Sequence, residues 1–348
     1  MDIREIDQSF AVRTKLNETD MVFHHILEEP IALHGVWYED AHFVRMPKAV
    51  AQMVNPGVAS LRENSAGGRI RFVTDSPYIA IQVKYYSTQP MDHFTLCGVA
   101  GLDLYAKEEG GFSYAGTFRP PVELKDYYES ILRPNRGLCT YQINMPLYST
   151  VEMVRIGIKD GCVLAPAEGY LHKKPIVFLG SSITQGGCAS RPGMTYTEML
   201  SRRLNFDYVN LGFSGSCRGE DAMMDYIASL DMSAFVYDYD HNTPSLEHLK
   251  QTHERGFLRV REKHPDLPII LLTAPTWQRN EYFAARRDVI YATYEKAKAR
   301  GDNNVYFIDG ETLFAICKKD GTVDGTHPND LGFYSMAEAI APVLEKIL

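Results

Sequence analysis

Two segments of the sequence hold residues that could act together as a nucleophile and its base. In Gly180-Ser181-Ser182-Ile183 the glycine permits a tight turn that presents a hydroxyl, which makes Ser182 a candidate nucleophile. Far along the chain, Asp324 and His327 stand three residues apart in a polar turn. A carboxylate at this spacing can hold one imidazole nitrogen while the other nitrogen faces a serine. A helix-capping serine and a solvated loop histidine are the alternatives that each segment leaves open on its own.

Two further polar segments offer neutral hydrogen-bond donors. The first runs from Asn210 to Ser216 and contains Gly215. The second runs from Asp238 to Thr243 and contains Asn242. A backbone N–H and a side-chain amide are both suited to hold the negative oxygen that develops during acyl transfer. Taken singly, Gly215 also suits a left-handed turn, and Asn242 also suits a helix N-cap before Pro244.

The second half of the chain alternates short apolar runs with long helical stretches, and these elements would position the four segments. The apolar runs are typical of buried parallel strands, and the five we predict are Ile176 to Leu179, Tyr208 to Leu211, Ala234 to Tyr239, Ile269 to Thr273 and Val305 to Ile308. Thr195 to Leu204 and Asn280 to Arg300 have the length and composition of helices, and a C-terminal amphipathic helix begins near Leu331. This order predicts an α/β fold, a three-layer α/β/α domain with a flavodoxin-like parallel sheet. Its ligands should gather at the carboxyl ends of the strands.

The first half of the chain has a different hydrophobic period. Between about residues 30 and 165 apolar and polar residues alternate, as in Arg69 to Phe72 and Ile79 to Lys84. This pattern is typical of antiparallel strands with one buried face. Turn residues such as Asp75-Ser76-Pro77 separate the runs. We therefore predict a jelly-roll-like β-sandwich domain over residues 1–170, followed by the α/β/α domain over residues 171–348.

Taken in order, the four polar segments resemble the sequence blocks of the SGNH (GDSL-type) hydrolase family. The resemblance implies that Ser182 is the nucleophile, that His327 is the base and that Asp324 orients the base. It also implies an oxyanion hole formed by the Ser182 backbone, Gly215 and Asn242.

The resemblance extends to the first half of the chain but is incomplete in the second. Gly101-Leu102-Asp103-Leu104-Tyr105 is similar to the Gly-x-Asp-Leu-Tyr motif of a β-rich domain that precedes some bacterial SGNH esterase domains. Ser181 stands where the family has an aspartate, which leaves the nucleophile untouched. Asp240 stands where the family has a glycine, and Thr243 where it has an aspartate. We expect a side chain at position 240 to leave less room for the backbone around the oxyanion. The role of Asn242 therefore rests on a weaker match than the roles of Ser182 and His327.

The resemblance implies a serine-dependent carboxylic ester hydrolase that works through an acyl-enzyme. The β-rich domain suggests a short acyl group, such as acetyl, on a carbohydrate or other small molecule. An acyltransferase would use the same residues with an alcohol in place of water, and a carbohydrate-binding protein without activity is a third alternative. Trp277 could stack on a sugar or acyl group, or could only pack. Arg191 could contact the substrate near the nucleophile, or could be a plain exposed arginine at a helix entry.

Composition and charge argue against several other classes. The 348 residues are 45% hydrophobic and 23% charged, which fits a soluble globular protein of about two domains. The net charge of −8 argues against a nucleic-acid partner. No uninterrupted apolar run reaches the ~18 residues of a membrane span, so we expect no membrane partner. The first 15 residues carry scattered charges and no apolar stretch, so we predict a cytoplasmic location. The oligomeric state is left open.

Neither the cysteines nor the histidines point to a metal or a cofactor. The six cysteines are spread thinly with no CxxC pair, as expected of reduced thiols. Cys188 and Cys217 are near the polar segments, so one of them could be reactive, but we expect small buried thiols. Four histidines match no metal-ligand spacing, and we expect them on a solvated helix face. They are His241, His248, His253 and His264. We predict that the protein needs no metal and no cofactor.

Overall fold

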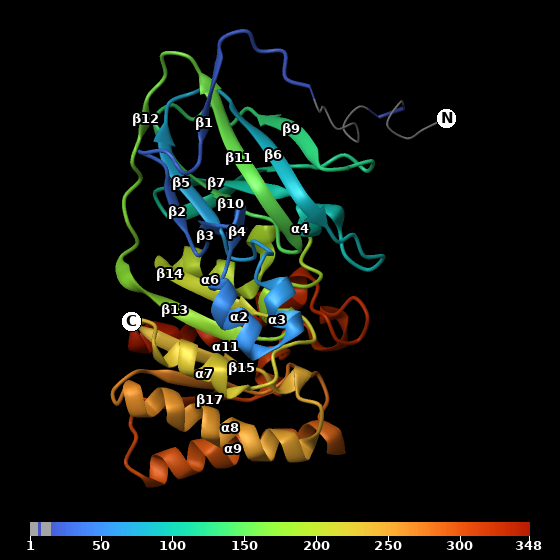
Figure 1. Ribbon diagram of the computed structural model, residues 1–348, viewed down its shortest axis with the longest axis vertical. Helices are drawn as coiled ribbons and strands as arrows, with labels where there is room; N and C mark the ends of the chain where they lie inside the picture. Colours follow the sequence, from blue (N-terminus) through green and yellow to red (C-terminus); the bar gives the residue numbers. More distant parts are fainter. Residues whose placement is uncertain (1–5, 8–14) are drawn as a thin grey trace.

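The computed structural model describes residues 6–7 and 15–348, and it places the two halves of the chain at opposite ends of an elongated molecule (Figure 1). The first half forms antiparallel sheets at the upper end, and the second half forms a parallel sheet with helices at the lower end. Most of the N-terminal segment on which the cytoplasmic prediction rests lies outside the described residues.

The first half is a β-sandwich of two antiparallel sheets, as predicted. The four-stranded sheet has the order β1 (Met21–His25), β11 (Ser149–Lys159), β6 (Ile79–Thr88) and β9 (Tyr127–Leu132). The second sheet has the order β12 (Leu164–Ala165), β5 (Arg69–Thr74), β10 (Cys139–Asn144), β7 (Leu102–Glu108) and β8 (Gly111–Phe118), with β2 (Ala32–His34) paired to β5. A separate hairpin joins β3 (Trp37–Glu39) to β4 (His42–Val44). Because alternate residues of a strand face the same side, Ile70 and Phe72 of β5 share one apolar core with Ile79 and Ile81 of β6.

On the polar face of β5, Arg69 is covered by the second half of the chain and Arg71 by the Phe112 and Tyr170 rings. Arg69 is 0% exposed and Arg71 is 2% exposed. Arg69 donates to the carbonyl oxygen of Tyr208 (3.0 Å) and the hydroxyl of Tyr170 (2.9 Å), and it forms an ion pair with Asp207. The period-two pattern predicts which side of the strand the arginines occupy. It does not predict that a second sheet lies against that side.

The second half is a three-layer α/β/α fold, as predicted. Its parallel sheet has the order β14 (Phe206–Gly212), β13 (His172–Gly180), β15 (Ala234–Asp238), β16 (Ile269–Leu272) and β17 (Val305–Ile308), so all five predicted strands are confirmed. Along β13, Ile176 and Phe178 enter one apolar core, while Val177 and Leu179 enter the other. One core is covered by α6 (Tyr196–Leu204), α10 (Gly310–Leu313) and α11 (Asp330–Ile347). The opposite core is covered by α7 (Asp221–Ala228), α8 (Leu246–Lys263) and α9 (Glu281–Ala299).

Two short helices from the first half of the chain also pack on the α/β half. They are α2 (Lys48–Val54) and α3 (Pro56–Leu61), and α2 packs against α7 (Figure 1). Ala51, Val54 and Val58 of these helices share an apolar core with Met223 and Met224 of α7. The chain passes from β12 to β13 between residues 165 and 172. The predicted domain boundary at residue 170 stays a prediction. The helices α2 and α3 precede this boundary in the sequence but pack on the α/β half.

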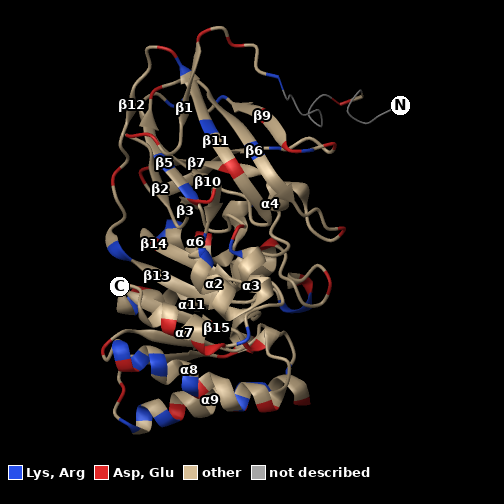
Figure 2. Ribbon diagram, in the orientation of Figure 1, with Lys and Arg blue, Asp and Glu red and all other residues tan. Residues whose placement is uncertain are grey.

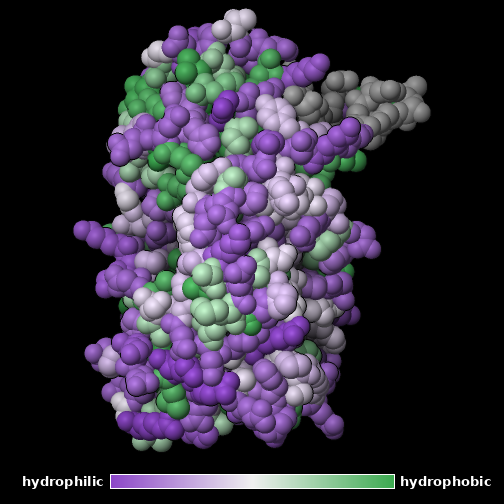
Figure 3. All heavy atoms as spheres, viewed as in Figure 1, coloured by the Kyte–Doolittle hydropathy of each residue, from purple (hydrophilic) through white to green (hydrophobic). Residues whose placement is uncertain are grey.

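The outer surface of the α/β half is strongly charged. Lys, Arg, Asp and Glu residues recur along α8 and α9 at the lower end of the molecule (Figure 2), and the same end is largely hydrophilic in the space-filling view (Figure 3). Within the described part of the chain, no helix combines the length and the apolar character that crossing a membrane requires.

Candidate active site

Ser182 follows the carboxyl end of β13, the strand between β14 and β15, where parallel sheets place their ligands. The chain turns there into α5 (Ser182–Gln185), and the Ser181 hydroxyl caps this helix by accepting a hydrogen bond from the N–H of Ile183 (3.1 Å). Gly180 has no space for a side chain, because a Cβ would overlap Thr184 and the Asp238 carbonyl. The capping role that the sequence leaves open thus belongs to Ser181, and Ser182 is free to present its hydroxyl.

Asp324 and His327 lie on a turn between η4 (Lys318–Gly321) and α11, and they reach Ser182 from the other end of the chain. The Nε2 atom of His327 is 2.9 Å from the Ser182 Oγ atom, and its Nδ1 atom is 2.7 Å from the Asp324 Oδ2 atom. The second carboxylate oxygen of Asp324 accepts from the backbone N–H groups of Thr326 (2.9 Å) and His327 (2.8 Å). A hydroxyl, an imidazole and a carboxylate therefore form one hydrogen-bonded line.

The electrostatics of this line keep the carboxylate charged. Burial alone would raise the pKa of Asp324, but hydrogen bonds from the His327 ring and from the backbone of His327 and Thr326 lower it to about 2. An ionised Asp324 accepts a hydrogen bond from the N–H at Nδ1 of His327, which leaves the Nε2 lone pair facing the serine. This is the tautomer that a base for Ser182 requires.

The two expected oxyanion donors lie on the turns that follow the strands on either side of β13. Gly215 follows β14 and has φ +64°, a left-handed conformation that suits glycine. Asn242 ends η3 (Asp240–Asn242) after β15, and its Oδ1 atom is buried without a hydrogen-bond partner. The oxyanion roles of Gly215 and Asn242 stay predictions.

A buried arginine from the first half of the chain holds the turn that carries Gly215. Arg45 is 0% exposed, and it lies over the Phe213 ring with 4.7 Å to the ring centroid. It donates to four backbone carbonyls, those of Leu61, Asn64, Asn210 and Gly212. Burial lowers the pKa of Arg45 to about 9, so the side chain stays charged at neutral pH. Sequence reasoning missed this residue, because an arginine bound only to carbonyls has no charged partner or motif to mark it.

Side chains of the Gly-x-Asp-Leu-Tyr motif form hydrogen bonds with the loop that follows the nucleophile. Asp103 and Tyr105 are two residues apart on β7 and so point the same way. Asp103 is 0% exposed and accepts from Arg191 (2.7 Å), the N–H of Gly193 (2.8 Å) and Asn144 (2.9 Å). Tyr105 accepts from the same Arg191 guanidinium (2.5 Å). The motif thus joins the β-sandwich to η2 (Pro192–Met194) of the α/β half.

This arrangement changes the interpretation of Arg191. Its side chain is 18% exposed, and its guanidinium is bound to Asp103 and Tyr105 and stacks over Tyr114. The position therefore supports a role in holding the loop and does not support the expected substrate contact.

Trp277 lies in the wall of a cavity beside the turn that carries His327. The cavity has a volume of about 360 Å³, and the Trp277 side chain is 49% exposed. The wall also includes Phe283, Phe314, His241, Gly325 and Thr326. An open cavity with aromatic walls next to the candidate base is a place for part of a small substrate.

The expectation of a solvated helix face is wrong for two of the four histidines. His253 is 1% exposed, stacks on Tyr237 and contacts the Thr293 hydroxyl (2.9 Å), and burial lowers its pKa to about 3. Burial, and then the nearby His327 and Arg286, lowers the pKa of His241 to about 4. Both rings are therefore neutral at physiological pH.

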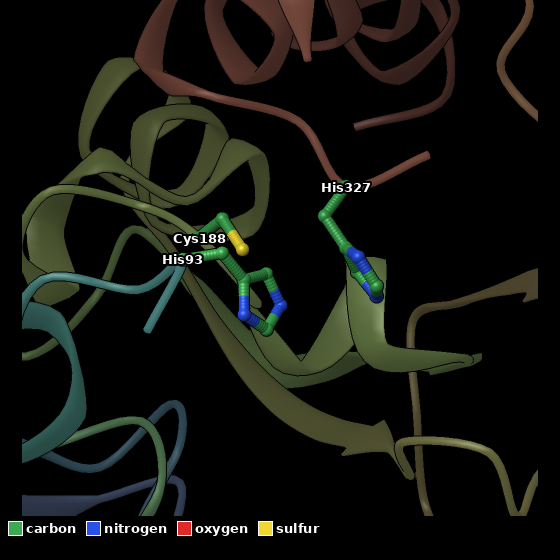
Figure 4. A group of neighbouring side chains, drawn as sticks. All are labelled: His93, Cys188 and His327. Carbon is green, nitrogen blue, oxygen red and sulfur yellow. The ribbon is translucent and has the colours of Figure 1, made fainter. Parts of the chain in front are cut away.

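Two further side chains border the candidate site. Sequence reasoning did not place His93 there, whereas Cys188 is one of the two cysteines it noted near the polar segments. His93, between β6 and α4 (Leu96–Ala100), has its ring centroid 5.6 Å from that of His327 and its Nε2 atom 3.9 Å from an Asp324 oxygen. Cys188 is buried as expected, and its sulfur lies near the rings of both His93 and His327 (Figure 4). Burial, and then the Asp324 carboxylate, raises the pKa of Cys188 to about 12. All six cysteines are free thiols.

Sequence patterns of known families match both halves of the chain. The pattern described as "GDSL-like Lipase/Acylhydrolase family" matches residues 173–345, and the pattern described as "N-terminus of Esterase_SGNH_hydro-type" matches residues 21–164. None of the curated proteins matches the chain in sequence.

Three solved structures resemble this one over most of its length. A GDSL-like lipase from Bacteroides ovatus ATCC 8483 is 31% identical, with a TM-score of 0.84 over 94% of this chain and 98% of that chain. The salicylyl-acyltransferase SsfX3 from a tetracycline biosynthetic pathway is 18% identical, with a TM-score of 0.73 over 95% and 99%. The acetyl xylan esterase Est2A from the rumen bacterium Butyrivibrio proteoclasticus is 13% identical, with a TM-score of 0.57 over 94% and 98%. The last two show a shared fold.

The chain belongs to the GDSL-like lipase/acylhydrolase family, also called the SGNH hydrolases. This membership makes it an enzyme of the esterase type.

Proposed function

We propose that this protein hydrolyses carboxylic esters with Ser182 as nucleophile, and that it removes short acyl groups, acetyl above all, from a carbohydrate or other small molecule. The single observation that carries the proposal is the hydrogen-bonded line of Ser182, His327 and Asp324, with 2.9 Å and 2.7 Å between the paired atoms. A serine paired in this way with a base and its orienting carboxylate is an activated nucleophile.

The reaction follows from this line in two steps. The Nε2 atom of His327 takes the proton as the Ser182 oxygen attacks the ester carbonyl, and the same proton then passes to the departing alcohol. Asp324 stabilises the imidazolium that forms. Donors from the Ser182 backbone, Gly215 and Asn242 would meet the tetrahedral oxygen, each worth about 3 kcal/mol of barrier. Water, deprotonated by His327, then releases the acyl group and restores the serine.

The substrate class rests on the cavity and on the related structures. About 360 Å³ of space beside the catalytic turn accommodates a small acyl group or one sugar ring, and the half-exposed Trp277 provides a stacking face. A neighbour of the same fold is an acetyl xylan esterase. These observations favour an acetylated sugar over a long-chain lipid as the substrate. The cytoplasmic location stays a prediction.

An acyltransferase is the second candidate, because the acyl-enzyme could pass its acyl group to an alcohol instead of water. The structural likeness to a salicylyl-acyltransferase favours it. Product analysis separates the two activities: with an ester substrate and a panel of alcohols, a hydrolase yields free acid and a transferase yields a new ester.

An inactive carbohydrate-binding protein is the third candidate, and the aligned serine, histidine and aspartate argue against it. A fluorophosphonate probe tests this directly, because it labels an activated serine. We expect the wild type to be labelled and Ser182→Ala to remain unlabelled. An unlabelled wild type would support the binding protein.

A further inference from the structure

Three nitrogen or sulfur donors meet beside the catalytic line, one each from His93, Cys188 and His327. Their donor atoms all lie within 4.8 Å of one another. Figure 4 shows the His93 ring with one edge toward His327 and the Cys188 sulfur beside it. The three residues come from three separate segments: the turn before α4, the loop after α5 and the turn before α11.

We propose that His93, Cys188 and His327 form a binding site for a thiophilic divalent cation, zinc above all, and that the bound ion reversibly switches the enzyme off. Two imidazoles and one thiolate are a ligand set that zinc binds in tetrahedral sites, with water as the fourth ligand. Magnesium and calcium prefer oxygen ligands, so the site should discriminate against them. The switching part of this inference rests on the proposed function, whereas the binding part does not.

The geometry needs only a small adjustment to hold the ion. Donor atoms around tetrahedral zinc lie roughly 3.5 Å apart, so the cluster must close by about 1 Å from its present limit. His93 can supply this movement, because it lies on a short turn with a side chain that is 33% exposed. Its Nδ1 atom is 3.2 Å from an Asp92 oxygen, and a carboxylate on the far ring nitrogen is the partner that metal-bound histidines commonly have.

The cysteine is held in place more firmly. Cys188 has φ +75°, which is unusual for a residue other than glycine. The loop after it is anchored on both sides: Ser190 donates to Asp330 through its N–H (2.8 Å) and its hydroxyl (2.5 Å), and its carbonyl accepts from Thr95 (2.6 Å). Thr95 is the N-cap of α4 and lies two residues after His93, so one hydrogen bond ties the two ligand segments together.

Zinc binding would remove the catalytic base whichever ring nitrogen of His327 it uses. At Nε2 the ion takes the lone pair that receives the serine proton. At Nδ1 it displaces the proton that His327 shares with Asp324; this proton moves to Nε2 and occupies the lone pair that would receive the serine proton. At Cys188 a zinc–sulfur bond replaces the S–H bond, and the thiol proton leaves to solvent. No electron is transferred, so chelation of the metal restores the resting enzyme.

The experiment measures p-nitrophenyl acetate hydrolysis in a series of buffered zinc concentrations. Because His93 and Cys188 border the catalytic line, the inhibition of His93→Ala and of Cys188→Ser is scored against the metal-free rate of the same variant. Each variant should raise the zinc concentration for half-inhibition by at least about tenfold. Chelator should restore the wild-type rate, and magnesium should leave it unchanged. The matched controls His248→Ala and Cys139→Ser should be inhibited like the wild type.

Two outcomes would overturn the switch: a wild type that zinc does not inhibit, or equal inhibition of the wild type and both cluster variants. A second readout needs no activity. Cobalt added to Ser182→Ala, which retains all three ligands, should give a thiolate-to-cobalt charge-transfer absorption that is lost in Ser182→Ala/Cys188→Ser. A chain that shows this band but hydrolyses no ester would refute the proposed function and keep the site. A chain that hydrolyses esters without the band or zinc inhibition would refute only the site.

Discussion

The ion pair between Asp103 and Arg191 offers a quantitative test of how the β-sandwich supports the α/β half. Asp103 is 0% exposed and accepts three hydrogen bonds, from Arg191, Gly193 and Asn144. Asp103→Ala leaves the Arg191 charge without its partner, which costs about 3 kcal/mol at the lower end of the range for buried pairs, since the Arg191 side chain is 18% exposed. The two lost hydrogen bonds from Gly193 and Asn144 add about 0.5 kcal/mol each, the lower end of the net range.

We therefore expect Asp103→Ala to lower the free energy of unfolding by about 4 kcal/mol, measured by urea denaturation with circular dichroism. Asp103→Asn keeps one acceptor oxygen and the shape of the side chain, so it should cost about half as much. The matched control is Glu338→Ala, which removes the exposed pair with Arg203 (3.0 Å) and should give no measurable change. A loss below about 1 kcal/mol for Asp103→Ala would refute the idea that this contact joins the two halves.

Three other predictions follow from named contacts. Arg45→Met frees the turn that carries Gly215 and should lower kcat about tenfold or more while changing KM little; an unchanged kcat would contradict the positioning role. Trp277→Ala should raise KM for an acetylated sugar about three- to tenfold, and an unchanged KM would place the sugar elsewhere. Burial, and then the neighbouring Asp240, raises the pKa of Asp238 from 3.8 to about 8, so the folded chain keeps a proton that the unfolded chain releases, and stability falls as pH rises through this range. In urea unfolding, the free energy of unfolding of Asp238→Asn should rise relative to that of the wild type by about 1 kcal/mol per pH unit between ~pH 5 and 8. A difference between the two proteins that does not change with pH would contradict the raised pKa of Asp238.

The parts of the structure that follow from local pattern could be predicted from the sequence. Each buried strand of the parallel sheet is a short apolar run, and its two faces are both covered, so the run stands out without any knowledge of its partners. The polar residues directly after three of these strands, together with the later turn that carries Asp324 and His327, then define the candidate site, because parallel strands bring their carboxyl ends to one edge.

What could not be predicted depends on contacts between distant segments. His93 and Cys188 are 95 positions apart in the chain, and neither belongs to a spacing that signals a ligand or an active site. Arg45 binds only backbone carbonyls, which leave no trace in residue types. His253 looks like a solvated helix residue until Tyr237 of β15 is packed against its ring. In each case the missing information is which element lies opposite, and local periodicity does not contain it.

The most direct test of the central claim is to find the acyl-enzyme. Rapid acid quench during p-nitrophenyl acetate turnover, followed by peptide mass spectrometry, should show an acetyl group on Ser182, and the variant His327→Ala should fail to accumulate it. An acetyl group on another residue, or turnover that continues unchanged in Ser182→Ala, would contradict the account.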